Sequence, residues 1–153
     1  MPNQYTHILD VPEVKRFLRL DEDYTDEDQD LENMISGALS FIERNTNHIF
    51  RIQSKTYYRG YLDYIDVYDY PINSAPAGVL PCKRFPNYSS YDHDSVTLQI
   101  GYTTREQVPP DLIQAALQMI KVFYYEAEKN VNTSLLPMAV DEILNSNKRF
   151  FAC

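Results

Sequence analysis

The chain has 153 residues, 44% of them hydrophobic and 24% charged, and its 14 Lys and Arg against 22 Asp and Glu give a formal net charge of −8. This length and composition predict one globular domain with a hydrophobic core, and they exclude a low-complexity chain. The negative charge excludes a general electrostatic footprint for nucleic acid, although an acidic lumen would suit a protein that surrounds DNA without gripping it.

The two cysteines, Cys82 and Cys153, show neither metal-ligand spacing nor the density of a disulfide framework, so we expect a reducing compartment. The first residues lack the basic start and apolar stretch of a signal peptide. No run of residues approaches the roughly 20 apolar positions that are needed to cross a bilayer. We therefore expect a soluble protein with no membrane partner.

The first predicted helix covers about residues 11–20. Asp10 precedes it and Glu13 follows three residues later, which is the pattern of a capped helix start. One apolar face is formed by Val14, Phe17 and Leu18. Positive side chains lie toward the C-terminal end, where they complement the helix dipole: Lys15, Arg16 and Arg19.

The second predicted helix begins in an acidic segment and runs to about Asn45. Thr25 and Asp28 have the spacing of a capping box, and further carboxylates crowd the first turn. Apolar side chains then recur at steps of three and four residues and predict a core face: Leu31, Met34, Ile35, Ala38, Phe41 and Ile42.

The same acidic segment partly matches a calcium-binding loop. Positions one, three, five and twelve of that register are occupied by Asp21, Asp23, Thr25 and Glu32. Position six requires glycine for a sharp turn, and here it is Asp26. We therefore interpret the segment as a solvated helix start and not as a metal site.

Residues 49–70 are rich in Tyr, Ile and Val, which favour strands. Gly60 lies between RIQSKTYYR and YLDYIDVYDY and predicts a hairpin turn between two strands. Side chains alternate across a strand, so Ile65 and Val67 would share one face of the second strand. The other face would carry Tyr64, Asp66, Tyr68 and Tyr70.

Residues 71–94 contain four prolines with Asn, Ser and Gly between them, and we expect an extended loop inserted into the domain. The following segment, SVTLQIGY, has the alternation of a half-buried strand. Its apolar face would be formed by Val96, Leu98, Ile100 and Tyr102, against Thr97 and Gln99.

The strongest helix prediction covers residues 110–129, with Pro109 and Pro110 at its start. One apolar stripe consists of Leu112, Ala115, Ala116, Met119, Ile120 and Phe123. A second consists of Ile113, Leu117 and Tyr124. So wide an apolar surface must be covered on more than one side, either centrally in a bundle or by another subunit.

A short last helix is predicted over about residues 138–144, followed by a C-terminal tail of residues 145–153 that ends in KRFFAC. Phe150 and Phe151 in this tail have no reason to be exposed on an isolated monomer. The predicted fold class is mainly α with a small β element (α+β). We expect a helical bundle that carries an inserted antiparallel hairpin or short sheet and a long Pro-rich loop.

Catalytic motifs are missing. His7, His48 and His93 are far apart in sequence, and no glycine-rich phosphate loop, nucleophile elbow or HExxH pattern occurs. Eight of the 13 tyrosines fall between Tyr57 and Tyr91, without the basic neighbours of a nucleic-acid stacking groove. We interpret them as packing on the sheet or across a subunit interface, and we expect no enzyme activity and no cofactor or metal.

The order of the elements carries a family resemblance. VKRFLRLD precedes an acidic helix, DEDQDLENMISGALSFIERNTN, then a strand region with YPI, then VTLQIGYTT and VPPDLIQAALQMIKVFYYEAE. The most distinctive parts are the Gly101-Tyr102 pair leading into Val108-Pro109, the Tyr124-Tyr125-Glu126 end of the long helix and a late LLP turn. In this order, nearly the whole chain resembles the head-tail connector, or adaptor, family of tailed bacteriophages.

The resemblance implies a structural virion protein that is made in the host cytoplasm and assembles in the neck as a closed ring, a dodecamer, beneath the portal protein. The ring would help to retain packaged DNA, pass it through a central channel without sequence-specific binding and receive the next neck, stopper or tail protein. Closure of a ring requires two different, complementary patches on each subunit.

Three sets of residues are candidates for these contacts. For the subunit interface we select Leu117, Tyr124 and Tyr125. For a tail that binds the portal we select Lys148, Arg149, Phe150 and Phe151. For a loop that contacts the neighbouring neck or tail protein we select Tyr88 and Tyr91.

Three alternatives remain open from sequence. Within phage structure, the nearest is a neck stopper or tail-completion protein, which would not contact the portal directly. A metal-dependent enzyme would use the acidic and histidine-containing segments. An acidic regulator that mimics DNA would bind a basic, nucleic-acid-binding host protein.

Overall fold

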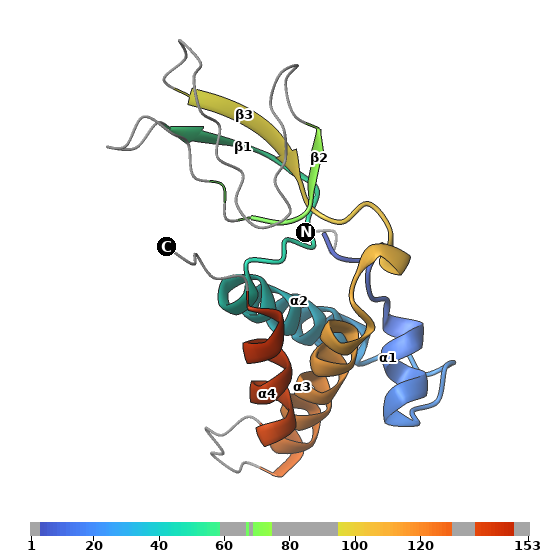
Figure 1. The fold of residues 1–153 in the computed structure, drawn as a ribbon. Coiled ribbons are helices and arrows are strands. Elements are labelled where there is room, and N and C mark those ends of the chain that lie inside the picture. The colour runs from blue at the N-terminus through green and yellow to red at the C-terminus, as the bar shows by residue number, and fades with distance from the viewer. Residues whose placement is uncertain (1–3, 59–66, 68, 75–94, 130–136, 149–153) are drawn as a thin grey trace. The chain divides into compact units, whose positions relative to one another are not determined.

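The computed structural model describes residues 4–58, 67, 69–74, 95–129 and 137–148. The chain forms two compact units (Figure 1). A helical unit is built from residues up to Thr46 and from Thr103 to Lys148, and a sheet unit from Asn47 to Tyr102. Helices together with a small antiparallel sheet confirm the predicted α+β class.

The helical unit contains α1 (Val11–Leu18), α2 (Asp28–Thr46), the 3-10 turn η1 (Arg105–Gln107), α3 (Pro110–Lys129) and α4 (Met138–Asn147). Helices α2 and α3 pack against each other, and each also contacts both remaining helices. Among the described residues α1 and α4 do not contact one another, and they lie on different sides of the α2–α3 pair (Figure 1).

Helix α1 begins as predicted and ends early. The Asp10 carboxylate accepts a hydrogen bond of 2.9 Å from the Glu13 amide, which satisfies one of the free N–H groups of the first turn. Arg19 adopts a left-handed conformation with φ of 62°, so the helix stops two residues before the predicted end at Leu20.

Helix α3 occupies the centre of its unit. Its buried side chains include members of both predicted stripes: Leu112, Ile113, Ala115, Ala116, Leu117, Met119 and Ile120. They pack against α1, α2 and α4 of the same chain. The expectation that this helix is covered on more than one side is therefore met within the subunit.

The sheet unit contains β1 (Gln53–Tyr58), β2 (Ile72–Ser74) and β3 (Ser95–Ile100) in the order β1-β3-β2, with both pairings antiparallel. Along β3 buried and exposed residues alternate, as predicted. The core of this unit is formed by Ile49, Tyr57, Val67, Val96, Leu98 and Ile100.

Two boundaries differ from the predictions. Residues 72–74, expected in the Pro-rich loop, form strand β2 and pair with β3. Helix α4 continues to Asn147, so the first three residues expected in the tail are helical. The hairpin predicted at Gly60 and most of the loop, residues 75–94, lie outside the described residues.

Candidate interaction surfaces

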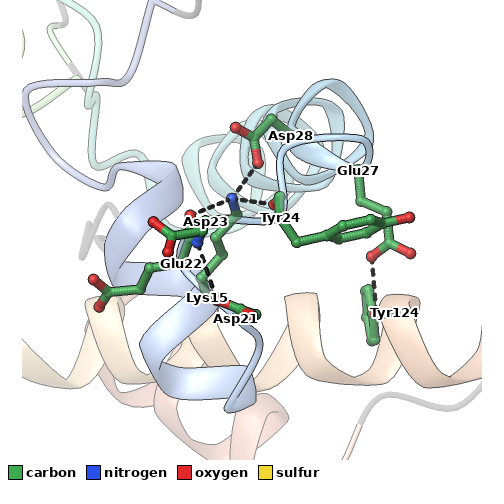
Figure 2. Close-up of polar contacts among 8 residues, drawn as sticks. All are labelled: Lys15, Asp21, Glu22, Asp23, Tyr24, Glu27, Asp28 and Tyr124. Atoms are coloured by element: carbon green, nitrogen blue, oxygen red, sulfur yellow. Dashed lines mark hydrogen bonds and ion pairs between the residues drawn. The ribbon is translucent and has the colours of Figure 1, made fainter.

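The acidic segment between α1 and α2 is organised around a lysine (Figure 2). The Lys15 ammonium donates to the carbonyl oxygens of Glu22 at 3.3 Å and Tyr24 at 2.6 Å. It also lies 2.6 Å from a carboxylate oxygen of Asp28, in the first turn of α2. Lys15 is only 4% exposed, so these three oxygen partners compensate for the loss of its hydration.

Lys15 lies in the last turn of α1, as predicted, and its side chain is buried. Its ammonium takes the central position among the oxygens of the acidic segment. Asp21, the first residue of the calcium-loop register, accepts a 3.1 Å hydrogen bond from the Asp23 amide. Within the described residues no group of three or more metal-type side chains comes together.

A tyrosine surface lies where the acidic segment meets the C-terminal half of α3. The Tyr124 hydroxyl donates a 2.9 Å hydrogen bond to the Glu27 carboxylate (Figure 2). The Tyr125 ring packs edge-on against Tyr124, with ring centres 5.5 Å apart, and is 38% exposed. Tyr124 is thus tied within its own subunit, while Tyr125 remains accessible to solvent.

A cleft of about 340 Å³ opens beside the first turns of α3. Its floor consists of the buried apolar side chains Val108, Ile113 and Leu117. Glu106 and Gln114 are exposed on its polar rim. This volume is enough for one or two apolar side chains and lies at the lower end of the range for small-molecule pockets.

The rim of the cleft is held by an ion pair across 92 residues of sequence. Both terminal nitrogens of Arg105 contact the Glu13 carboxylate of α1, one of them at 2.5 Å. A two-pronged pair of this kind fixes the orientation of both side chains. The cleft is therefore anchored to α1 as well as to α3.

Glu106 keeps its negative charge on this rim. Its own backbone N–H, then the Thr104 hydroxyl and the positive charge of Arg105 lower the pKa of the Glu106 carboxyl below its usual value of 4.5. The cleft consequently combines an apolar floor with an ionised carboxylate at its edge.

The three selected interface residues fall on two surfaces. Leu117 lies in the floor of the cleft and is 7% exposed, whereas Tyr124 and Tyr125 form the tyrosine surface about 10 Å further along α3. Lys148 is exposed directly after α4. The remaining tail and loop candidates lie outside the described residues, and their contacts stay predictions: Arg149, Phe150, Phe151, Tyr88 and Tyr91.

Sequence reasoning missed the cleft as a unit. The second apolar stripe of α3 included Ile113 and Leu117. Nothing in the sequence pattern indicated that Val108 and Glu106 line the same cleft. The Arg105–Glu13 pair also leaves no local signal, since its partners are 92 residues apart.

No helix among the described residues is long and apolar enough to cross a membrane. No protein-family model and no curated protein matches the sequence. Solved structures do match the fold over the whole chain. One is a chain from the neck of an empty gene transfer agent (GTA) particle with C6 symmetry, at a TM-score of 0.75 and 19% identity, covering 100% of this chain and 95% of that chain.

Two further structures agree with this match. A chain in the virion of a native GTA particle has a TM-score of 0.71 and 17% identity, and a chain from the neck of a native GTA particle with C12 symmetry has 0.67 and 14%. Each match covers 100% of this chain and 94% of the other. The resemblance seen in the sequence is therefore confirmed at the level of the fold: this chain is folded like a protein from the neck of a phage-like particle.

Proposed function

We propose that this chain is a structural, non-enzymatic protein of the neck of a tailed phage or phage-like particle. The observation that carries the proposal is the likeness of the entire chain, over both units, to a chain from a GTA neck. The likeness covers 100% of this chain and 95% of the other, so the two proteins share their entire architecture and not only one domain. This favours a shared structural role.

Within the neck, the function we favour is that of a ring adaptor between the portal and the tail. The similar neck structures have C6 and C12 symmetry, and a closed ring of twelve copies suits both. A ring needs two different patches on each subunit, and the helical unit offers both the tyrosine surface and the cleft. Leu117 belongs to one patch, and Tyr124 and Tyr125 to the other.

The charge of the chain suits a channel for DNA. A net charge of −8 per copy repels the phosphate backbone and opposes tight adhesion of DNA to the ring. Packaged DNA would be retained by closure of the neck and would still pass through the ring without sequence-specific binding.

The experiment that tests this function is co-sedimentation of the purified protein with assembled portal rings from the same genome, followed by electron microscopy of the pellet. We expect a second ring stacked coaxially on the portal, with a stoichiometry that can be counted. Absence of the protein from the pellet at saturating concentration would reject the adaptor role. Binding only to a preformed portal–adaptor assembly would identify a stopper further down the neck.

The tyrosine surface can be tested in the same assay. Tyr125→Asp places a charge at an exposed aromatic position and should prevent ring formation while circular dichroism of the monomer stays unchanged. Asn33→Asp is the matched control, because it adds the same charge at an exposed position of α2. Normal rings from Tyr125→Asp would remove this surface from the interface.

A further inference from the structure

The cleft beside α3 has the chemistry of a receptor for a short apolar and basic segment. Val108, Ile113 and Leu117 provide an apolar floor, and a buried apolar pocket with a polar rim is the usual centre of a protein contact. The negative Glu106 stands exposed on the rim. A segment that places aromatic side chains next to a positive charge would match both features.

The chain itself contains such a segment immediately after α4. The Asn147 amide donates a 2.5 Å hydrogen bond to the Asp111 carboxylate in the first turn of α3. The chain therefore leaves α4 at the same end of α3 that carries the cleft. The sequence continues from the exposed Lys148 with Arg149, Phe150 and Phe151.

The exit point and the cleft lie at different positions around the first turns of α3. The cleft rim is fixed to α1 by the Arg105–Glu13 pair, whereas the tail leaves from α4, and α1 and α4 do not touch among the described residues. Around α3, Asp111 lies roughly a third of a turn away from the positions that line the cleft. Two different patches at different positions are what a ring contact requires.

The two patches also lie at one level along α3. Asp111 contacts the end of α4, and Gln114 stands on the rim of the cleft one turn away. The point where the chain leaves α4 and the rim of the cleft are therefore close to the same turns of α3. Residues 149–153 span at most about 17 Å when extended.

We propose that the C-terminal tail of one copy binds in the cleft of the next copy, with Phe150 or Phe151 on the apolar floor and Arg149 beside Glu106. The proposal rests on the ring function proposed above and gives the cleft its partner on the neighbouring copy. It gives the tail a different partner from the portal, and the two partners can be distinguished experimentally.

The natural Cys153 makes a direct test possible. Gln114→Cys places a thiol on the exposed rim of the cleft, and Cys82→Ser removes the other natural thiol. A disulfide forms only where two Cα atoms approach within about 7 Å. Oxidation of rings assembled on the portal should link chains through residues 114 and 153 and give a ladder of multimers on non-reducing gels.

Lys121→Cys in the same background is the matched control. It is exposed on the same helix but lies about 10 Å further along, so its yield of linked chains should be severalfold lower. Circular dichroism of each variant establishes that the fold is intact. The Cys82→Ser protein without any added cysteine should form rings that contain no linked chains.

The outcomes separate the tail contact from the ring itself. Rings that are visible on the portal but give no link, or only a link within one chain, overturn the tail contact and leave the ring function standing. Failure of the unmodified protein to form rings on the portal rejects the ring function, and the tail contact with it.

A charge exchange provides a second, independent readout. Glu106→Lys should reduce the link between residues 114 and 153 severalfold, because it opposes the positive tail. Adding Arg149→Glu to that variant should restore the link. If neither substitution changes the yield of linked chains, the pairing of Arg149 with Glu106 is overturned.

Discussion

The two units of this protein are stabilised in different ways. In the helical unit the interior around α3 is aliphatic, and the buried polar side chains lie on α1 and α2: Lys15, Glu43 and Thr46. In the sheet unit the buried polar contacts involve aromatic side chains: a nitrogen of the His48 ring lies 2.6 Å from the Tyr102 hydroxyl, and the Tyr57 hydroxyl donates to Asp69 at 2.5 Å. Polar contacts depend on direction as well as volume, so both sets should tolerate fewer changes than the aliphatic interior around α3.

Several contacts of the sheet unit meet at one backbone position. The Gly101 amide donates to the Pro71 carbonyl at 3.0 Å, and the Asn73 side chain donates to the Gly101 carbonyl at 2.5 Å. The next amide, that of Tyr102, donates to the Ile49 carbonyl at 3.0 Å. This position therefore joins the end of β3 to two other segments of the same unit through backbone groups, whereas in the helical unit the Lys15 side chain joins α1 to the acidic segment and α2.

The largest effect is predicted for Gly101→Ala. Gly101 has φ of 112°, and a Cβ atom at this position would overlap the carbonyl group of Arg51. The strained conformation and the overlap together should lower the free energy of unfolding by at least about 3 kcal/mol. Urea denaturation followed by tyrosine fluorescence measures this loss. A loss below about 1 kcal/mol would show that the backbone relaxes easily, and the contrast between the units would be weakened.

Local sequence patterns were sufficient for much of the fold. Asp10 and Glu13 predicted the start of α1 to the residue, because helix capping involves neighbours in sequence. The alternation around Leu98 predicted β3, and the two stripes of α3 predicted a helix that is covered on several sides. Each of these signals repeats within a few residues, so no tertiary information is needed to interpret it.

Other features depend on partners that are far away in sequence. Strand β2 has only three residues and exists through pairing with β3, so its composition resembles a loop. The carbonyl groups around Lys15 come from the backbone, which the identity of residues does not reveal. Of the candidate surfaces, the stripes and tyrosines of α3 were found from sequence, and the cleft that Arg105 and Glu13 help to form was not.

A second prediction compares one lysine from each unit. Lys15→Met should cost about 2 kcal/mol, because the Lys15 side chain is only 5% exposed and its removal leaves two backbone carbonyls and the 38% exposed Asp28 carboxylate without their cation. Lys55→Met should cost less than about 1 kcal/mol, since the Lys55 side chain is 50% exposed in its pair with Asp69. The substitution in the helical unit should therefore cause the larger loss of unfolding free energy. This result would show that the burial of a polar contact, and not the unit to which it belongs, determines how much the contact stabilises the fold.

Both lysine variants can be measured by chemical denaturation under identical conditions. The hydrophobic stem of methionine retains most of the packing of the lysine chain, so the difference between the variants reports mainly on the lost charge. Equal losses for the two variants would mean that the acidic segment rearranges around the Lys15→Met substitution without penalty.

The smallest effect has the opposite sign. Gly37 is exposed in the middle of α2, and a Cβ atom there would meet nothing within 4 Å. Gly37→Ala should therefore raise the free energy of unfolding by about 0.5 to 1 kcal/mol, since alanine loses less backbone entropy on entering a helix. The same substitution that disrupts the sheet unit at Gly101 should thus stabilise the helical unit. If Gly37→Ala is destabilising instead, this face of α2 contacts another copy of the chain. The variant should then also form fewer rings on the portal.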